Sequence, residues 1–362
     1  MNKLEIIGLM SGTSLDGLDM AHVQFEKREK GITFKMLHFE TIAYDAYFRN
    51  ELKNAISLST EKIFLLDKKI GKVFAENVLE FLKKHNIEKH RINVIASHGQ
   101  TIFHQPSAGF TSQIGCGSTI AFLTDIPVVN DFRTLDVIAG GQGAPLVPIG
   151  DKLLFGNEVA SFLNIGGFCN ISFTKNEQQV AFDICPGNLP LNRMANSFGL
   201  DYDKNGELAK SGKINASLLT SLNELPFYAA DFPKSLGTEW LEESFMPLLH
   251  SSNCKKEDLL RTITEHISFQ ISKTLNENNL QSLYITGGGA KNDFLIYCLR
   301  KYYAGQLIIP SEQLIDCKEA LIFALLGAMY LWDLPSNVPS VSGASEALIL
   351  GTYHKTGRIA SK

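Results

Sequence analysis

The sequence predicts an α/β protein with two domains, and three observations lead to this prediction. The chain has 362 residues, more than one hydrophobic core usually organises, and 44% of them are hydrophobic, enough for two cores. Short apolar runs rich in Ile, Leu and Val alternate with long amphipathic segments. Three glycine-rich turns each follow one of the apolar runs. An alternation of strands and helices is typical of layered α/β folds.

The expected strands are short continuous apolar runs that end in glycine or polar turns, as buried strands do. The expected helices are longer segments with apolar residues three or four positions apart, which places one stripe of each helix against a core. The predicted strands are residues 4–10, 94–97, 126–129, 160–165 and 280–286, and the predicted helices are residues 61–84, 257–276 and 320–332.

The stretch at 139–148, AGGQGAPLVP, is too rich in glycine for the interior of a helix or strand. We therefore expect a loop there, and we expect the chain to cross between its domains close to it, with a substrate cleft alongside. The predicted domains are residues 1–133, completed by residues 335–362, and residues 134–334.

Charge and cysteine content exclude several classes of protein. The chain has 34 Lys+Arg against 38 Asp+Glu, with no basic block, so nucleic acid is not an expected partner. The six cysteines stand far apart, which favours free thiols in the reducing cytoplasm over disulfides or a zinc site. No signal peptide is visible and the longest apolar run has 13 residues, fewer than the ~20 of a membrane span, so no membrane partner is expected.

The three glycine-rich turns suggest a site for a phosphate-bearing ligand. Glycine lets backbone N–H groups approach an anion closely, Ser and Thr hydroxyls add donors, and an Asp can orient Mg²⁺ or its water. Each turn taken alone is more often a simple tight turn, and only the three together favour a nucleotide. The P-loop pattern GxxxxGK[ST] is absent, and the turn at 287–289 lacks the last glycine of GxGxxG.

Seven short motifs resemble the anhydro-N-acetylmuramic acid kinase family. They occur in the family's order from residue 8 to about residue 290, and weaker matches at 233–237, 319–320 and 343–344 extend the resemblance over nearly the whole chain. The motifs are GLMSGTSLDGLD (8–19), SHGQT (97–101), DFR (131–133), GGQGAPLVP (140–148), LNIGG (163–167), FD (182–183) with PGN (186–188), and GGG (287–289).

The resemblance implies a two-domain actin-like ATPase/sugar kinase fold with a central interdomain cleft. It also implies a bacterial enzyme of cell-wall recycling that uses ATP and Mg²⁺ to open the ring of 1,6-anhydro-N-acetylmuramic acid and to phosphorylate O6. The expected partners are therefore ATP and a small amino sugar, while the oligomeric state, a homodimer among the options, stays open. Two rival functions remain: a kinase for another anhydro sugar such as levoglucosan, and a non-catalytic actin-like nucleotide-binding protein.

The resemblance assigns roles residue by residue, with Asp183 as the base that takes a proton from the attacking water. No protein ligand is assigned to Mg²⁺, which is expected to be held mainly by the ATP phosphates and water. The expected ATP-binding residues are Gly12, Thr13, Ser14, Leu15, Asp16, Gly17, Leu18, Asp19, Gly166, Gly167, Gly287, Gly288 and Gly289, and the expected sugar-binding residues are Gln100, Thr101, Asp131, Arg133 and Glu319.

Each assignment has an ordinary structural alternative. An Asp at a strand end, such as Asp183, is often a helix cap or a turn former. Asp131 and Arg133 could form a surface ion pair of little energetic weight. Glu319 precedes the apolar run 320–332 and could simply favour a helix N-terminus. We expect His98 and His104 to be structural or to support residues that contact a ligand, because they are not at metal-ligand spacing.

The sequence departs from the family pattern at two places after Asp183. Ile184 and Cys185 stand where the family has Cys or Thr followed by Gly, and Asn192 stands where it has a second Asp. The loss of a glycine beside Pro186 could alter the turn, and an amide in place of a carboxylate removes a charge. These departures bear on rate and sugar specificity, while the Asp183 carboxylate itself is present.

Overall fold

The computed structural model describes residues 2–29, 31–156, 159 and 161–358, and the chain forms two compact units. Unit 1 comprises Met1–Phe155 and Cys317–Lys362, and unit 2 comprises Gly156–Asp316. The unit boundaries differ from the domain boundaries proposed from sequence, because residues 134–155 and 317–334 pack with unit 1. The glycine-rich stretch 139–148 therefore lies within unit 1, and the chain leaves this unit after Phe155.

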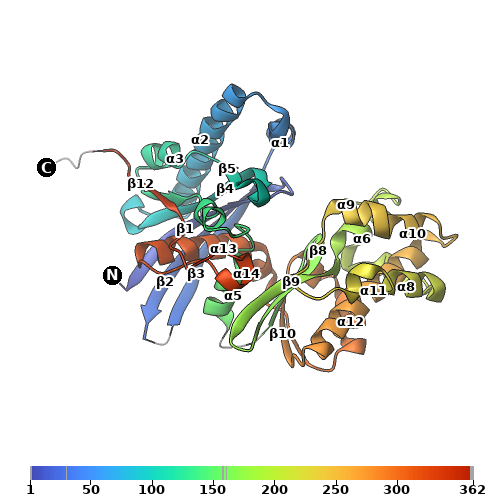
Figure 1. The fold of residues 1–362 in the computed structure, drawn as a ribbon. Helices are drawn as coiled ribbons and strands as arrows, with labels where there is room; N and C mark the ends of the chain where they lie inside the picture. The colour runs from blue at the N-terminus through green and yellow to red at the C-terminus, as the bar shows by residue number, and fades with distance from the viewer. Residues whose placement is uncertain (1, 30, 157–158, 160, 359–362) are drawn as a thin grey trace. The chain divides into compact units, whose positions relative to one another are not determined.

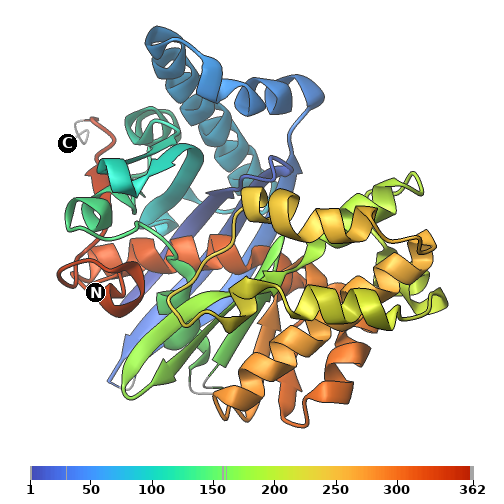
Figure 2. The same cartoon turned by 45° about the vertical axis from the view of Figure 1, so that its right-hand side comes forward.

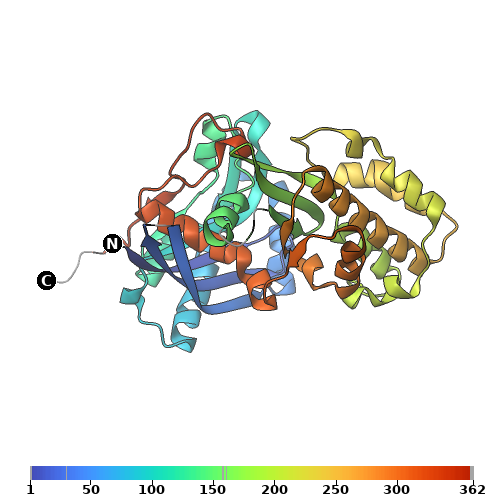
Figure 3. The ribbon, with the colours of Figure 1, turned by 90° about the horizontal axis from the view of Figure 1, so that it is seen from below.

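Unit 1 is built on a seven-stranded mixed sheet with the strand order β12-β6-β4-β1-β2-β3, and β5 pairs with β4 outside this path. Figure 3 shows the blue strands β1 to β3 side by side. Its strands and 3₁₀ helices are β1 (Lys3–Ser11), β2 (Gly17–Arg28), β3 (Gly31–Ala43), η1 (Ala55–Ser57), η2 (Lys89–Arg91), β4 (Val94–Gln105), η3 (Pro106–Ala108), β5 (Phe110–Ile114), β6 (Val128–Asn130) and β12 (Thr352–His354).

Helices cover both faces of β1. Ile7 and Leu9 belong to the same buried cluster as Phe74 of helix α2, whereas Gly8 between them faces helix α13. A Cβ on Gly8 would lie 2.0 Å from the Ala320 carbonyl oxygen, so the strand needs glycine there for α13 to pack closely. Figure 2 shows α13 crossing the blue strands. The α-helices that belong to unit 1, or that begin just before it in the case of α13, are α1 (Ala46–Lys53), α2 (Thr60–Lys84), α3 (Gly117–Thr124), α4 (Thr134–Ile138), α5 (Val147–Phe155), α13 (Glu312–Leu331) and α14 (Pro339–Ser342).

Two contacts explain why α5 and α13 belong together in unit 1. Lys318 Nζ on α13 lies 2.8 Å from Asp151 Oδ1 on α5, and both side chains are buried. Gly150 lies against Ile322, leaving no room for a Cβ. Breaking such a buried pair by removing one partner leaves an uncompensated charge, so the two helices are strongly coupled.

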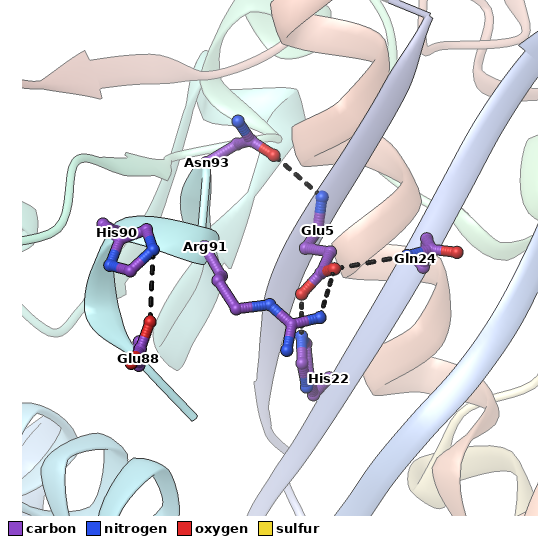
Figure 4. A network of polar contacts seen from close by, with 7 residues as sticks. All are labelled: Glu5, His22, Gln24, Glu88, His90, Arg91 and Asn93. Atoms are coloured by element: carbon purple, nitrogen blue, oxygen red, sulfur yellow. Dashed lines mark hydrogen bonds and ion pairs between the residues drawn. The ribbon is translucent and has the colours of Figure 1, made fainter. Parts of the chain in front are cut away.

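A polar network fixes the start of β1 to its neighbours (Figure 4). The Glu5 carboxylate accepts from Arg91 Nη2 at 2.8 Å and from Gln24 Nε2 at 3.2 Å, and it lies 3.2 Å from His22 Nε2. Burial raises the pKa of Glu5, but the bond and charge of Arg91, with smaller contributions from His22 and Gln24, outweigh it and lower the pKa. The backbone N–H of Glu5 donates to the Asn93 side chain, which joins β1 to the segment before β4.

Unit 2 has a five-stranded sheet with the order β11-β10-β7-β8-β9. Its core joins strand residues such as Leu163 and Ile171 to the apolar stripe of α11, which includes Ile263, Ile267 and Ile271. Figure 1 labels most of these elements. They are β7 (Ser161–Ile165), β8 (Phe168–Lys175), β9 (Gln178–Pro186), α6 (Asn188–Asn196), η4 (Lys204–Gly206), α7 (Glu207–Ser211), α8 (Ala216–Asn223), η5 (Pro226–Ala229), α9 (Thr238–Trp240), η6 (Leu241–Phe245), α10 (Met246–His250), α11 (Lys256–Glu277), β10 (Ser282–Thr286), η7 (Gly288–Lys291), α12 (Asp293–Tyr302) and β11 (Gln306–Ile308).

The predicted elements are all present, with shifted ends. Residues 61–84 and 257–276 are helical as α2 and α11, and the apolar runs at 4–10, 94–97, 126–129, 160–165 and 280–286 contain or overlap β1, β4, β6, β7 and β10. Ala160, the first residue of one predicted strand, lies outside the described residues. Within the part of the chain that the structure describes, no helix is both long and apolar enough to span a bilayer.

Candidate active-site residues

The turn after β1 is held in place by hydrogen bonds to the buried side chain of Gln100. Ser11 Oγ donates to Gln100 Oε1 at 2.6 Å and shares a 2.6 Å hydrogen bond with the Tyr44 hydroxyl, while Gln100 Nε2 donates to the Gly12 carbonyl at 3.4 Å. Gln100 is buried, and both the oxygen and the nitrogen of its amide form hydrogen bonds with the turn. Gln100 therefore fixes the position of the predicted phosphate-binding turn.

The rest of the turn is open to solvent. Thr13, Ser14 and Asp16 are exposed, and Leu15 adopts a positive φ of 59° and donates its N–H to the Gly12 carbonyl. Gly17 begins β2, where a Cβ would lie 2.4 Å from the Ile42 carbonyl oxygen. The exposed hydroxyls and backbone of this turn are of the kind that binds phosphate oxygens. Leu18 is buried in the core next to it.

Asp19 and Glu319 place two carboxylates near each other in unit 1. Asp19 Oδ1 accepts from Thr41 Oγ1 at 2.5 Å. Glu319 is open to solvent but crowded by protein atoms, and this desolvation, followed by the charge of Asp19, raises its pKa, although Arg133 and Lys318 act in the opposite direction. Glu319 lies seven residues after the first residue of α13, so the interpretation of Glu319 as an N-terminal helix residue is wrong.

Arg133 is bound to neutral groups of unit 1. Its Nε and Nη2 lie 3.2 and 3.0 Å from His98 Nε2, and its Nη1 donates to the Gly143 carbonyl at 2.7 Å. Burial lowers the pKa of Arg133 to about 10, with the charge of Glu319 opposing the shift. Its direct hydrogen-bond partners, His98 and Gly143, are neutral, and Glu319 acts on it only through its charge, so the guanidinium is suited to an anionic ligand.

Asp131 and Thr101 have local partners. The Asp131 carboxylate accepts from Thr134 Oγ1 at 2.6 Å at the start of α4, and Asp131 itself has a positive φ of 57°. It thus shapes the turn that carries Arg133. Thr101 is half-buried on β4, and its hydroxyl accepts from Gln113 Nε2 at 3.4 Å.

Asp136 is a residue that the sequence analysis missed. Its fully buried carboxylate accepts from the Gly143 N–H at 2.7 Å, from Ser342 Oγ at 2.7 Å and from Asn337 Nδ2 at 3.0 Å. Three segments, one of them 206 residues away along the chain, are joined at this group. The carboxylate holds the loop whose Gly143 carbonyl binds Arg133. The only signal in the sequence is its position between the DFR and GGQG motifs.

Two of the three glycine-rich turns come together in unit 2. β7 and β10 are parallel neighbours, with Asn164 opposite Thr286, so the turns that follow them lie at the same edge of the sheet. A Cβ on Gly287 would lie 2.6 Å from the Ile165 carbonyl oxygen, and one on Gly289 would lie 2.1 Å from an Ile165 side-chain carbon. The turns therefore pack at backbone distance. Gly166 is half-buried, while Gly167 and Gly288 are exposed.

The segment after β9 completes this edge. Gly187 and Asn188 donate their N–H groups to the carbonyls of Gly167 and Gly166, each at 2.8 Å. The Asn188 side chain donates to the Ile165 carbonyl at 3.2 Å. The PGN motif thus braces the glycine turn, leaving a cluster of tight backbone turns at the ends of three strands, an arrangement suited to phosphate groups.

Asp183 lies inside β9, three residues before the strand ends, and not at a strand end as the sequence indicated. It is not a helix cap, because the N-cap of α6 is Gly187. Its Oδ2 accepts from the Leu236 N–H at 2.8 Å, and its own N–H donates to the Lys234 carbonyl at 3.0 Å. Burial raises the pKa of Asp183, and the Leu236 N–H partly offsets this rise. A carboxylate of raised pKa is a stronger base.

A β-bulge decides which face of the sheet carries Asp183. Asn170 pairs with Asp183 but Cys169 pairs with Cys185, so β9 has one extra residue, Ile184, between the two pairs. Consecutive residues on β8 point to opposite faces, and Asp183 therefore shares a face with the exposed Asn170 while Cys185 lies in the core. In a regular strand Asp183 and Cys185 would share a face.

The departures from the family pattern are accommodated locally. Ile184 and Cys185 are both buried in the unit 2 core, and neither has a positive φ, so no glycine is required at Cys185. Asn192 is half-buried on α6, one helical turn after Asn188. The structure brings Gly166, Gly167 and Gly287–Gly289 together in unit 2, and it brings Asp19, Arg133 and Glu319 together in unit 1.

Carboxylates suit Mg²⁺, which usually takes one or two of them together with substrate phosphates and water. Among the residues that the structure describes, no group of three or more His, Cys, Asp or Glu side chains is arranged to hold a metal ion. Asp19 lies beside the turn after β1 and close to the carboxylate of Glu319. It therefore fits the role of one of the one or two carboxylates that Mg²⁺ usually takes.

A family model described as anhydro-N-acetylmuramic acid kinase matches residues 4–356. A protein of Bacillus cereus (strain AH820) with the same name is 35% identical over 373 residues, covering 96% of this chain and 98% of the relative. One of Bacillus thuringiensis (strain Al Hakam) is 35% identical over 378 residues, covering 97% of this chain and 98% of the relative.

Solved structures are more distant. The activator of the 2-hydroxyisocaproyl-CoA dehydratase from Clostridium difficile, with bound ADPNP, is 14% identical, with a TM-score of 0.44 and coverage of 91% of this chain and 97% of that one. A ROK family glucokinase from Streptomyces griseus, in complex with glucose and AMPPNP, is 11% identical, with a TM-score of 0.40 and coverage of 89% of this chain and 98% of that one.

Proposed function

This chain belongs to the anhydro-N-acetylmuramic acid kinase family, and we propose that it performs the family's coupled reaction with Asp183 as the base. In this reaction water adds to C1 of 1,6-anhydro-N-acetylmuramic acid, the C1–O6 bond breaks, and O6 takes the γ-phosphoryl group of ATP. The products are N-acetylmuramic acid 6-phosphate and ADP. The observation that carries the assignment of the base is the environment of Asp183: half-buried, turned out of the core by the bulge, and of raised pKa.

The group that needs a base in this reaction is the attacking water. The anhydro sugar has no free O6 hydroxyl, so a base is needed for the water that attacks C1 and not for the phosphate acceptor. The Asp183 carboxylate takes that proton, as the general base of an inverting glycoside hydrolase does. Leu236 holds one carboxylate oxygen through its N–H, which fixes the orientation of the group.

We assign the glycine turns of both units to ATP. The turns at Gly166–Gly167 and Gly287–Gly289 would present backbone N–H groups to phosphate oxygens, and the turn at Gly12–Gly17 would add the hydroxyls of Thr13 and Ser14. Mg²⁺ bound with ATP would neutralise charge on the phosphates, with Asp19 as the side chain best placed to hold it or its water. The resemblance assigns Gln100 to the sugar, but both ends of its buried amide form hydrogen bonds with the turn after Ser11, so we assign it to keeping that turn in place.

The amino sugar carries a lactyl carboxylate, and we assign Arg133 to it. The guanidinium is preoriented by His98 and Gly143, and both of these partners are neutral. Glu319, Asp131 and Thr101 are the further polar groups proposed to meet sugar hydroxyls. The six free cysteines support a cytoplasmic location, where the sugar and ATP would both be present.

The Asp183→Asn variant tests the proposal. It nearly preserves shape but removes the base, so turnover should fall by roughly 10²–10⁴-fold, with little change in sugar binding. Ring opening and phosphoryl transfer should fall together, measured by mass detection of the products. Asp231→Asn, an exposed change nearby in unit 2, is the matched control. An Asp183→Asn enzyme that opens the ring at the original rate would remove Asp183 from the chemistry.

The sugar itself is tested by a panel of anhydro and open sugars incubated with the protein and ATP-Mg²⁺. Phosphorylation of 1,6-anhydro-N-acetylmuramic acid in preference to levoglucosan is the expected result, because levoglucosan lacks the carboxylate that Arg133 is proposed to bind. Equal use of both sugars would contradict the role given to Arg133.

A further inference from the structure

The segment between η5 and α9 holds Asp183 on two sides. The Asp183 N–H donates to the Lys234 carbonyl at 3.0 Å, and the Leu236 N–H donates to Asp183 Oδ2 at 2.8 Å. One bond fixes the backbone of β9 to the segment and the other fixes the carboxylate. The position of this segment therefore determines the hydrogen bonding of Asp183.

The side chain of Lys234 holds the same segment through hydrogen bonds to η5 and the residue after it. Its Nζ donates to the Ala230 carbonyl at 2.9 Å and to the Phe227 carbonyl at 3.2 Å, and it lies 4.8 Å from the centre of the Phe227 ring. Two carbonyls and an aromatic face hold the ammonium group, and Glu277 and Asp231 act on it only through their charges, since no carboxylate of the described residues forms an ion pair with it. The ammonium thus links Lys234 to η5, which begins eight residues earlier in the chain.

We propose that Lys234 is a positioning residue for the reaction, whose ammonium group ties the segment to η5 and thereby keeps the Leu236 N–H on the Asp183 carboxylate. The inference rests on the proposed role of Asp183 as the base. Lys234 acts through the backbone of its own segment and needs no contact with either substrate.

The charged form of Asp183 depends on this contact. Burial raises the pKa of Asp183, and the Leu236 N–H is the group that lowers it. The other titratable groups on the neighbouring elements are Cys169 on β8, Cys185 on β9, Tyr228, Asp231 and Lys234 around the segment, and His266, Lys273 and Glu277 on α11. None of these supplies a charge that offsets the burial of Asp183.

The Lys234→Met variant removes the ammonium group and keeps a long apolar side chain. When the segment is released, the carboxylate loses its N–H donor, so the pKa of Asp183 should rise. A base must be deprotonated to act, and the acid limb of the kcat/KM profile should therefore move to higher pH by roughly half a unit to one unit. The Lys234→Arg variant, whose guanidinium can donate to both carbonyls, should keep the original limb.

The matched control is Lys273→Met on α11. Lys273 is close enough to lower the pKa of Lys234, but it pairs with Glu277 and, among the described residues, forms no hydrogen bond or ion pair with residues 234–236. Its profile should be unchanged. If Lys234→Met does not fold, Lys234→Gln retains one donor and should give a smaller shift in the same direction.

Amide hydrogen exchange gives a readout that does not depend on activity. Faster exchange at Asp183 and Leu236 in Lys234→Met, but not in Lys273→Met or Lys234→Arg, would support the proposal. Unchanged exchange at both amides would overturn it, even if the acid limb moves, because charge alone would then explain the shift. If Asp183→Asn retains full turnover, the proposed function has failed, and the exchange measurement still decides whether Lys234 ties the segment.

Discussion

Arg133 approaches His98 with two donors, Nε at 3.2 Å and Nη2 at 3.0 Å, both directed at the same imidazole nitrogen, Nε2. That nitrogen must accept, so the proton of the neutral ring lies on Nδ1, which donates to the Gly99 carbonyl at 2.9 Å. Burial, followed by the charge of Arg133, lowers the pKa of His98 to about 3. The pair is thus a neutral imidazole that orients a cation.

The Arg133→Lys variant should weaken sugar binding more than ATP binding. An ammonium group cannot contact His98 and Gly143 while presenting two parallel donors to a carboxylate. We expect the KM for the sugar to rise by about 10- to 100-fold with a smaller change in the KM for ATP, as for the loss of a charged hydrogen-bonded pair. The exposed Arg91→Lys is the control for loss of a guanidinium. An equal rise in both KM values would mean that Arg133 serves the nucleotide or the fold.

The Asp136→Asn variant should affect both stability and sugar binding. The amide can still accept from Gly143, but its NH₂ group then faces Asn337 Nδ2, which is also a donor. We expect unit 1 to lose about 1–3 kcal/mol in urea unfolding and the KM for the sugar to rise severalfold through Arg133. The KM for ATP should stay constant. Asp125→Asn at the surface is the control, and a KM for the sugar equal to that of the control would contradict the link to Arg133.

Stability should fall as the pH drops below 6.5. Burial lowers the pKa of His266 to about 3, and its ring is held neutral between the Tyr228 hydroxyl at 2.8 Å and Asn223 Oδ1 at 2.7 Å. The folded pKa lies below the unfolded value, so the unfolded chain takes up the proton first and stability is lost between pH 6.5 and 3. The loss of unfolding free energy approaches about 1.4 kcal/mol per pH unit for His266, and His98 adds a loss of the same size.

Urea unfolding at pH 7.5, 6 and 5 measures this slope. His266→Gln should reduce the slope of unfolding free energy against pH by the contribution of one histidine. The control His90→Gln, at a well-exposed position, should leave the slope unchanged. A slope that His266→Gln does not alter would show that His266 is not the group responsible.

Local patterns in the sequence were sufficient to locate the main helices and strands. The stripe of residues 61–84 gives α2 within one residue, because its spacing depends only on the helix itself. The boundary between the units could not be found in this way. It depends on the packing of α13 against Gly8 and on the buried pair of Asp151 and Lys318, which are contacts between distant parts of the chain.

The candidate site, like the fold, could be predicted from sequence only where local motifs mark it. The glycine turns and Asp183 stand in recognisable motifs, and the structure places the turns of unit 2 at one sheet edge. Asp136 could not be identified, because its partners Asn337 and Ser342 are about two hundred residues away. The position of Asp183 within β9 depends on the pairing with β8, which no pattern in a single strand reveals.

The extra residue in β9 also bears on how the chain can change in length. The pairs on either side of Ile184 would both survive its deletion, because a regular ladder joins Asn170 to Asp183 and Cys169 to Cys185 just as the bulged one does. Loss of a second residue would instead shift one of these pairs and turn either the carboxylate or the thiol to the wrong face. Natural variation in chain length should therefore be confined here to one residue, and where that residue is present it should suit the buried position that Ile184 occupies.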